Sequence, residues 1–192
     1  MQINEYPWMV ALTSSLDPKD HFCGGTLVAS RYVVTAAHCV VINGEISRPS
    51  AVRVRVGDHD LATTGETDVE RTVAVSRIIV HHGYDNTTTD NDIALLYTAE
   101  HLDLATYTPA CIAESGETFA GDTATVYGWG TVELGGVRAH KLLEVDVDVV
   151  TNEECSAAMH HITESMLCAG GQEGEDACQV SSIVNQLNWS IL

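Results

Sequence analysis

Short apolar segments separated by turn residues dominate the first half of the chain. They are rich in Val and Ile or alternate apolar with polar positions, and residues 51–56 read Ala-Val-Arg-Val-Arg-Val with a period of two. Long helical patterns do not occur in this half. Regular strand spacing of this kind predicts an all-β barrel or sandwich. The expected strands are residues 8–12, 25–29, 32–35, 51–56, 72–80 and 93–97.

A second series of apolar segments follows at residues 123–128, 141–150 and 166–169. Between the last two, Thr151 is followed three positions later by Glu154, which is a helix-capping signal. We therefore expect one short helix to begin at Thr151 within a second group of strands.

Charge limits the classes of partner. The 192 residues include 27 acidic and 9 basic ones, for a formal net charge of -18. That balance argues against binding to nucleic acid or to an anionic membrane. No apolar stretch approaches the roughly 18 residues of a membrane span. A soluble monomer is the expectation.

Cysteine content indicates the compartment. Six cysteines and two glycosylation-type triplets, at Asn86 and Asn188, point to a location outside the cytosol. No signal peptide is visible at the start, where Met1 leads directly into a polar and aromatic segment. We therefore expect an extracellular protein whose N-terminus is incomplete in this sequence.

The run Thr-Ala-Ala-His-Cys at residues 35–39 is the strongest candidate for chemistry. His38 follows an apolar strand at a turn of small residues, and Cys39 can fix the turn from behind. A general base needs a rigid ring with one nitrogen directed to a cleft. For an isolated histidine, a buried residue at a strand end would be the better interpretation.

A second run, Asp-Asn-Asp-Ile-Ala-Leu at residues 90–95, places Asp92 at the start of a strongly apolar strand. A carboxylate there is costly to bury unless it is paired, and a histidine N–H is a suitable partner. The alternative is a turn residue that begins the strand, a role that Asp90 fits better.

Together with Cys-Gly-Gly-Thr-Leu at residues 23–27 and Gly-Trp-Gly at 128–130, these runs resemble the chymotrypsin-like (trypsin-type) serine proteases. The resemblance implies two six-stranded antiparallel barrels with the active site between them. We expect a trypsin-like domain over residues 1–179, with a complete first barrel at 5–105 and an incomplete second barrel at 118–179. It also implies that His38 is the general base and that Asp92 orients it.

The resemblance also implies the cysteine pairing. Cys23 bonds Cys39 beneath the histidine, and Cys155 bonds Cys168 across the short helix. The family partners of Cys111 and Cys178 lie in segments that this chain does not contain. Spacing alone allows fifteen pairings of six cysteines.

Two further sites follow from the resemblance. Asp176 matches the base of the primary-specificity pocket, where a carboxylate pairs with Arg or Lys of the substrate; a solvated acidic loop is the alternative. Asp58, Asp60 and Glu70 lie in the loop where many family members bind calcium. The alternative there is an exposed acidic loop. No other cofactor is required, and the pairs at 81–82 and 160–161 are expected to be surface histidines that point to opposite faces.

The resemblance stops after Gln179. The family continues with Gly-Asp-Ser-Gly-Gly-Pro, which carries the nucleophile, whereas residues 180–185 here read Val-Ser-Ser-Ile-Val-Asn. Val180 stands where a glycine donates an oxyanion-hole N–H, so we interpret the alignment of Ser182 with the nucleophile as chance. Residues 180–192 are then a non-homologous tail.

The function expected from these residues is that of a serine endopeptidase that cleaves proteins or peptides after Arg or Lys. The chain as written is expected to be a truncated and inactive form, or the product of a misdrawn exon end. The rival hypothesis is a non-catalytic homologue that keeps the fold and acts as a binding or regulatory protein. A calcium-binding adhesive domain is a third and weaker interpretation.

Overall fold

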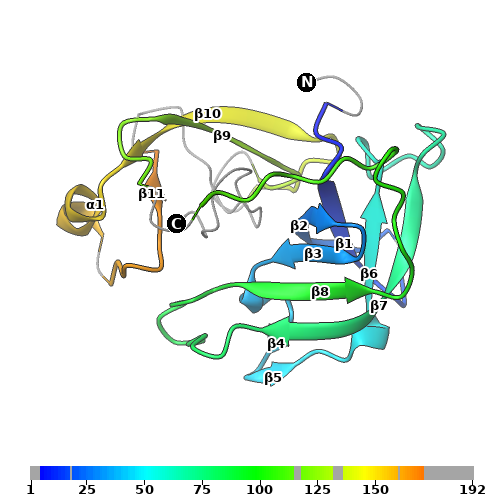
Figure 1. Cartoon of the computed structure of the whole chain (residues 1–192), viewed down its shortest axis with the longest axis horizontal. Helices are drawn as coiled ribbons and strands as arrows, with labels where there is room; N and C mark the ends of the chain where they lie inside the picture. The colour runs from blue at the N-terminus through cyan, green and yellow to red at the C-terminus, as the bar shows by residue number, and fades with distance from the viewer. Residues whose placement is uncertain (1–4, 18, 115–117, 132–135, 160, 171–192) are drawn as a thin grey trace.

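The computed structural model describes residues 5–17, 19–114, 118–131, 136–159 and 161–170. In these segments the chain is built from β-strands, with one short α-helix and two single turns of 3-10 helix (Figure 1). The fold is the all-β, chymotrypsin-like arrangement that the sequence predicts.

Six strands close into an antiparallel barrel in the order β1-β2-β3-β8-β7-β6. Their bounds are β1 Met9–Ser14, β2 His21–Ala29, β3 Tyr32–Thr35, β6 Val52–Val56, β7 Arg71–Val80 and β8 Ala94–Thr98. The period-two pattern explains β6, where Val52, Val54 and Val56 all face the barrel core. Because the barrel is closed, none of these six strands is left with an unpaired edge.

Three smaller elements lie between β3 and β6. The histidine turn is a 3-10 helix at Ala37–Cys39, and a second one occupies Pro49–Ala51. A two-stranded ribbon, β4 Val41–Ile42 and β5 Glu45–Ile46, turns through Asn43 and Gly44, both of which have positive φ. An Asn-Gly pair is the residue choice that such a tight hairpin favours.

The second half forms a three-stranded sheet within the described residues, in the order β11-β10-β9. Its strands are β9 Thr123–Gly128, β10 Leu143–Val150 and β11 Cys168–Ala169. In β10, Val147 and Val149 are buried while Asp146 and Asp148 are exposed, as alternation predicts. The expected strand at 166–169 is thus only two residues long.

Helix α1, Asn152–Ala158, begins where the capping signal predicts. The Thr151 hydroxyl accepts the Glu154 N–H at 3.1 Å, and a Glu154 carboxylate oxygen accepts the Thr151 N–H at 3.0 Å. This reciprocal capping box satisfies two backbone donors at the helix start. The disulfide between Cys155 and Cys168 then ties the helix to β11.

Aromatic side chains join the two halves. Trp8 donates its indole N–H to the Tyr127 hydroxyl at 2.7 Å, and Tyr6 stacks on the Tyr127 ring with centroids 4.1 Å apart. A shared cluster of buried residues lies behind them. It contains Met9, Ala11, Leu61, Tyr127, Trp129 and Leu142.

One local prediction is wrong. His81 and His82 do not lie on a strand with their rings on opposite faces. Strand β7 ends at Val80, and the two rings pack against each other with centroids 4.6 Å apart. The chain bends after β7 and the alternation of side chains is lost. Of the other pair, His160 lies outside the described residues.

Candidate active site

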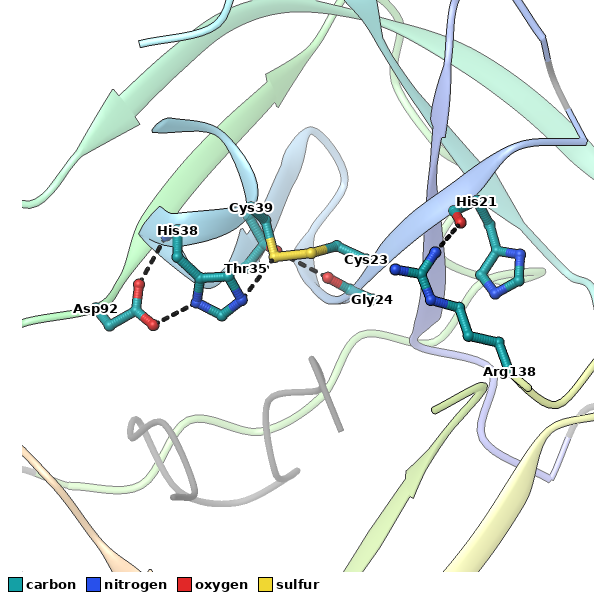
Figure 2. The surroundings of a disulfide bond; sticks show 8 residues. All are labelled: His21, Cys23, Gly24, Thr35, His38, Cys39, Asp92 and Arg138. Carbon is teal, nitrogen blue, oxygen red and sulfur yellow. Dashed lines mark hydrogen bonds and ion pairs between the residues drawn. A yellow bond between two sulfur atoms is a disulfide. The ribbon is translucent and has the colours of Figure 1, made fainter. Parts of the chain in front are cut away.

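Two contacts tie the turn that carries His38 to β2. The Cys23–Cys39 disulfide links β2 to the end of the turn, with 6.1 Å between the two Cα atoms. The Thr35 hydroxyl donates to the Gly24 carbonyl at 2.8 Å. Gly25 has no room for a side chain, because a Cβ there would lie 2.9 Å from Val33 Cγ1. Gly25 therefore allows β2 to pack closely against β3. Figure 2 shows the disulfide and the Thr35–Gly24 hydrogen bond beside His38.

Asp92 engages His38 with both carboxylate oxygens. Oδ2 lies 2.6 Å from Nδ1 of the ring, and Oδ1 accepts the backbone N–H of His38 at 2.8 Å. The Asp92 side chain is only 5% exposed, whereas that of His38 is 47% exposed. A carboxylate accepts hydrogen bonds, so Nδ1 carries the proton and Nε2 has the free lone pair.

The pKa of His38 follows from this contact. Hydrogen bonding to Asp92 raises the pKa of His38 above its ordinary value of 6.5, and burial opposes that rise. A buried carboxylate on Nδ1 both orients the imidazole and stabilises its protonated form. The pair can therefore take a proton at Nε2 from a group in front of the ring.

A tight turn delivers Asp92 to this position. Residues Asp85 and Asp90 form an isolated antiparallel bridge at its base, and Asn91 has a φ of 53°. Asp90 Oδ1 accepts from the Thr163 hydroxyl at 2.7 Å and also from the Ser165 hydroxyl. Ser165 Oγ in turn accepts the Asn91 N–H at 3.1 Å. Residues of the second half thus hold the turn that carries Asp92.

The electrostatics of Asp90 agree with that role. Hydrogen bonds from Ser165 and then from Thr163 lower the pKa of Asp90 below its ordinary value of 3.8. Asp90 is therefore an ionised acceptor at neutral pH. Sequence reasoning treated it only as a turn residue, because its partners lie more than seventy positions away.

The three residues predicted to bind calcium do not surround a common position that an ion could occupy. Nε of Arg55 contacts Oδ2 of Asp58, and its Nη2 donates to Glu70 Oε1 at 3.0 Å. Asp60 instead accepts the Ala62 N–H at 3.1 Å. The side chains of Arg55 and Asp58 are almost fully buried, at 5% and 1% exposed. The guanidinium occupies the position between the carboxylates, so these residues do not fit a calcium ion.

Burial is the largest influence on the pKa of Asp58 in this loop. Desolvation raises the pKa of Asp58 to about 6, although Arg55 acts in the opposite direction. Sequence reasoning missed Arg55 because Arg53 and Arg55 look equivalent in an alternating strand. The acidic loop that follows the strand was the one signal that could have indicated a buried partner for Arg55.

The remaining predicted residues divide into two groups. The Cys23–Cys39 and Cys155–Cys168 bonds are both present, and Cys111 is an exposed free thiol. Asp176, Cys178, Ser182 and the whole of residues 180–192 lie outside the described residues. Among the helices that the structure describes, none has the length and apolar character needed to cross a membrane.

Comparison with known proteins agrees with the fold. The family model described as Trypsin matches residues 1–182. A trypsin of Xenopus laevis is 34% identical over 179 residues, covering 92% of this chain and 68% of the relative. Venom serine protease 34 of Apis mellifera is 33% identical over 187 residues, which is 94% of this chain and 45% of the relative.

The Drosophila melanogaster protein masquerade is 35% identical over 184 residues, or 91% of this chain. The chain spans 17% of masquerade and less than half of venom serine protease 34. The chain belongs to the trypsin family of serine proteases.

Proposed function

We propose that this chain derives from an endopeptidase that hydrolyses peptide bonds by acyl transfer through a serine ester. His38 acts as general base and then general acid, and Asp92 holds the ring in the Nδ1–H tautomer. The observation that carries the proposal is the two-point contact of Asp92, at 2.6 Å to Nδ1 and 2.8 Å to the backbone nitrogen of His38.

The substrate class rests on the family resemblance. Asp176 matches the family residue that pairs with Arg or Lys at the cleaved bond, by charge-assisted hydrogen bonds. The substrate is a protein or peptide, and a net charge of -18 disfavours nucleic acid. Two disulfides suit an extracellular protein. We assign a monomeric state on the same family grounds.

A polypeptide of the printed sequence is expected to lack this activity. Catalysis of acyl transfer needs an oxyanion hole as well as a nucleophile, and loss of one donor costs about 10²–10³ in rate. Val180 replaces the glycine that supplies one donor, and Ser181 replaces the aspartate that precedes the nucleophile. Ser182 alone does not rebuild that neighbourhood.

The second candidate function is that of a non-catalytic homologue that binds or regulates other proteins. The same segment, residues 180–185, favours it, because a binding module has no need of the nucleophile motif. In that case the His38–Asp92 pair is retained only as part of the packed turn.

The transcript beyond the Gln179 codon distinguishes the two candidates. A protease origin predicts a transcript that encodes Gly-Asp-Ser-Gly-Gly-Pro directly after Gln179, and its product should cleave arginine and lysine amides. The printed 192-residue chain should show no turnover of the same substrates. Only transcripts that encode Val180, Ser181 and Ser182 would favour the non-catalytic homologue. If the 192-residue chain cleaved these substrates and Ser182→Ala abolished the cleavage, Ser182 would be the nucleophile. That result would contradict our interpretation of residues 180–185.

A further inference from the structure

His38 and the two cysteines beside it bring three potential metal ligands close together. Cys23 Sγ, Cys39 Sγ and a ring nitrogen of His38 all lie within 4.8 Å of one another, the only group of three such donors in the part of the chain that the structure describes. In the oxidised protein the two sulfurs are bonded to each other (Figure 2). Reduction would turn both sulfurs into thiols that can serve as metal ligands.

The spacing of one donor pair already suits a tetrahedral metal. His38 Nε2 lies 3.6 Å from Cys39 Sγ. A zinc ion with bonds of about 2.3 Å to sulfur and about 2.05 Å to nitrogen places those two atoms about 3.6 Å apart. The two sulfurs would have to separate to about 3.8 Å, which rotation of free cysteine side chains can supply.

The second ring nitrogen also has the partner that a metal site requires. Histidines that bind a metal usually donate their other N–H to a carboxylate, which fixes the tautomer and raises the basicity of the ligand. Asp92 Oδ2 makes this contact with Nδ1 at 2.6 Å. Nε2 is therefore the nitrogen left to bind a metal, and it lies 3.6 Å from Cys39 Sγ (Figure 2).

The site combines burial with access. Cys23 and Cys39 are buried, at 8% and 7% exposed, while the His38 side chain is 47% exposed. A metal can enter past the imidazole and reach thiols that lie in apolar surroundings. With three protein ligands, the fourth position of a tetrahedral ion stays open on the exposed side.

We propose that reduction of the Cys23–Cys39 bond creates a site for one zinc-type divalent cation, bound by both sulfurs and by His38 Nε2. A dithiol reductant supplies two electrons and two protons, and is itself oxidised to a disulfide. Metal binding then releases both thiol protons and yields two metal–thiolate bonds. The same event occupies Nε2 and withdraws His38 from acid–base chemistry.

Cobalt(II) titration of the reduced protein tests this site. The host is the variant C111S/C155S/C168S/C178S, which leaves Cys23 and Cys39 as its two cysteines. It is reduced with a phosphine that is removed before titration. Thiolate-bound tetrahedral cobalt gives an intense visible absorption. This absorption is lost when zinc displaces the cobalt. We expect one cobalt per chain, and none in the unreduced protein.

Three variants locate the ligands. His38→Gln should weaken cobalt binding at least about tenfold, and Asp92→Asn about 10–100-fold, as removal of an outer hydrogen-bond partner does in other sites. His82→Gln is the matched control, because this exposed histidine lies away from the sulfurs, and it should bind as the host does. Equal affinity in the host and in His38→Gln would overturn the proposal.

Near-ultraviolet circular dichroism covers the case in which reduction unfolds the chain. Zinc should then restore the near-ultraviolet signal of the reduced host and fail to restore that of reduced His38→Gln. Recovery in both proteins, or in neither, contradicts the site. The readout is metal binding and folding, so its outcome does not depend on whether the chain has proteolytic activity.

Discussion

At the scale of single residues, Arg55 on β6 supplies the positive charge that pairs with carboxylates of the acidic loop. Its guanidinium contacts Asp58, donates to Glu70 and also donates to the Thr63 carbonyl at 2.9 Å. Two carboxylates and one guanidinium leave the cluster with a single net negative charge. Breaking a buried pair of this kind leaves a charge without compensation and is strongly destabilising.

Arg55→Met should lower the free energy of unfolding at pH 8 by about 3–5 kcal/mol, because the buried Asp58 carboxylate then has no compensating positive charge. The loss should shrink as the pH falls from 8 toward about 6 and then level off. Without Arg55 the pKa of Asp58 rises further, so Asp58 of the variant takes up its proton at a higher pH than that of the unaltered protein. Urea unfolding at several pH values measures both effects.

Arg53→Met is the matched control, because the Arg53 side chain donates only to backbone carbonyls, of Ser50 and Val52. Calcium provides a second check. Millimolar CaCl₂ or a chelator should leave the melting temperature of the unaltered protein unchanged. A saturable rise in the melting temperature with calcium would show that the loop opens to bind the ion.

At the scale of elements, the turn before β8 depends on a segment of the other half. Asp90 and Asn91 are both tied to the stretch just before β11, through the Thr163 and Ser165 hydroxyls. Because Asp92 directly follows these residues, the position of its carboxylate is set by contacts between the halves as well as by β8 itself.

The double variant T163V/S165A should loosen this turn. Amide hydrogen exchange at Asn91 should become faster, because its N–H loses the Ser165 acceptor. Ser156→Ala removes a hydroxyl that bonds only within helix α1 and serves as the control. Unchanged exchange at Asn91 in the double variant would mean that the Asp90 side chain alone holds the turn.

The elements themselves could be predicted from the sequence to within a few residues. Short apolar segments between turn residues place β3 and β9 at their observed bounds, and the Thr151 capping signal places α1. The family motifs led to His38 and Asp92. These features are local, so a short stretch of sequence carries them.

The parts that could not be predicted are contacts that depend on how the chain folds in three dimensions. The burial of Arg55 depends on how the loop folds back over β6, and the Asp90 contacts join segments more than seventy residues apart. The packing of His81 on His82 depends on where β7 ends. No period or motif in one segment reports such a contact.

At the scale of the whole molecule, the two halves differ in how much core they bury within the residues that the structure describes. The barrel encloses a large cluster that includes Leu12, Leu27 and Leu96, all fully buried. The cluster of the described second sheet is small and contains Ala124, Val126, Val147, Val149 and Leu167. A smaller core contributes less apolar burial and so less stability.

Limited proteolysis should therefore cut the region after about residue 118 first and leave a fragment that ends near residues 110–120. Cleavage sites are identified by mass spectrometry of the fragments. The Trp8–Tyr127 contact is one link between the halves that opposes this separation. Uniform resistance and a single cooperative melt would show that they form one unit.

The central claim is that His38 and Asp92 form the acid–base pair of a serine protease. Nuclear magnetic resonance of the His38 ring in the oxidised protein measures its pKa directly. Asp92 raises the pKa of His38, so the pair stabilises the fold fully below pH 6.5, and this stability declines as the pH rises through the pKa of folded His38. We predict a pKa above 6.5 with the proton on Nδ1, and a lower pKa in Asp92→Asn. A pKa at or below 6.5 that Asp92→Asn leaves unchanged would contradict the account.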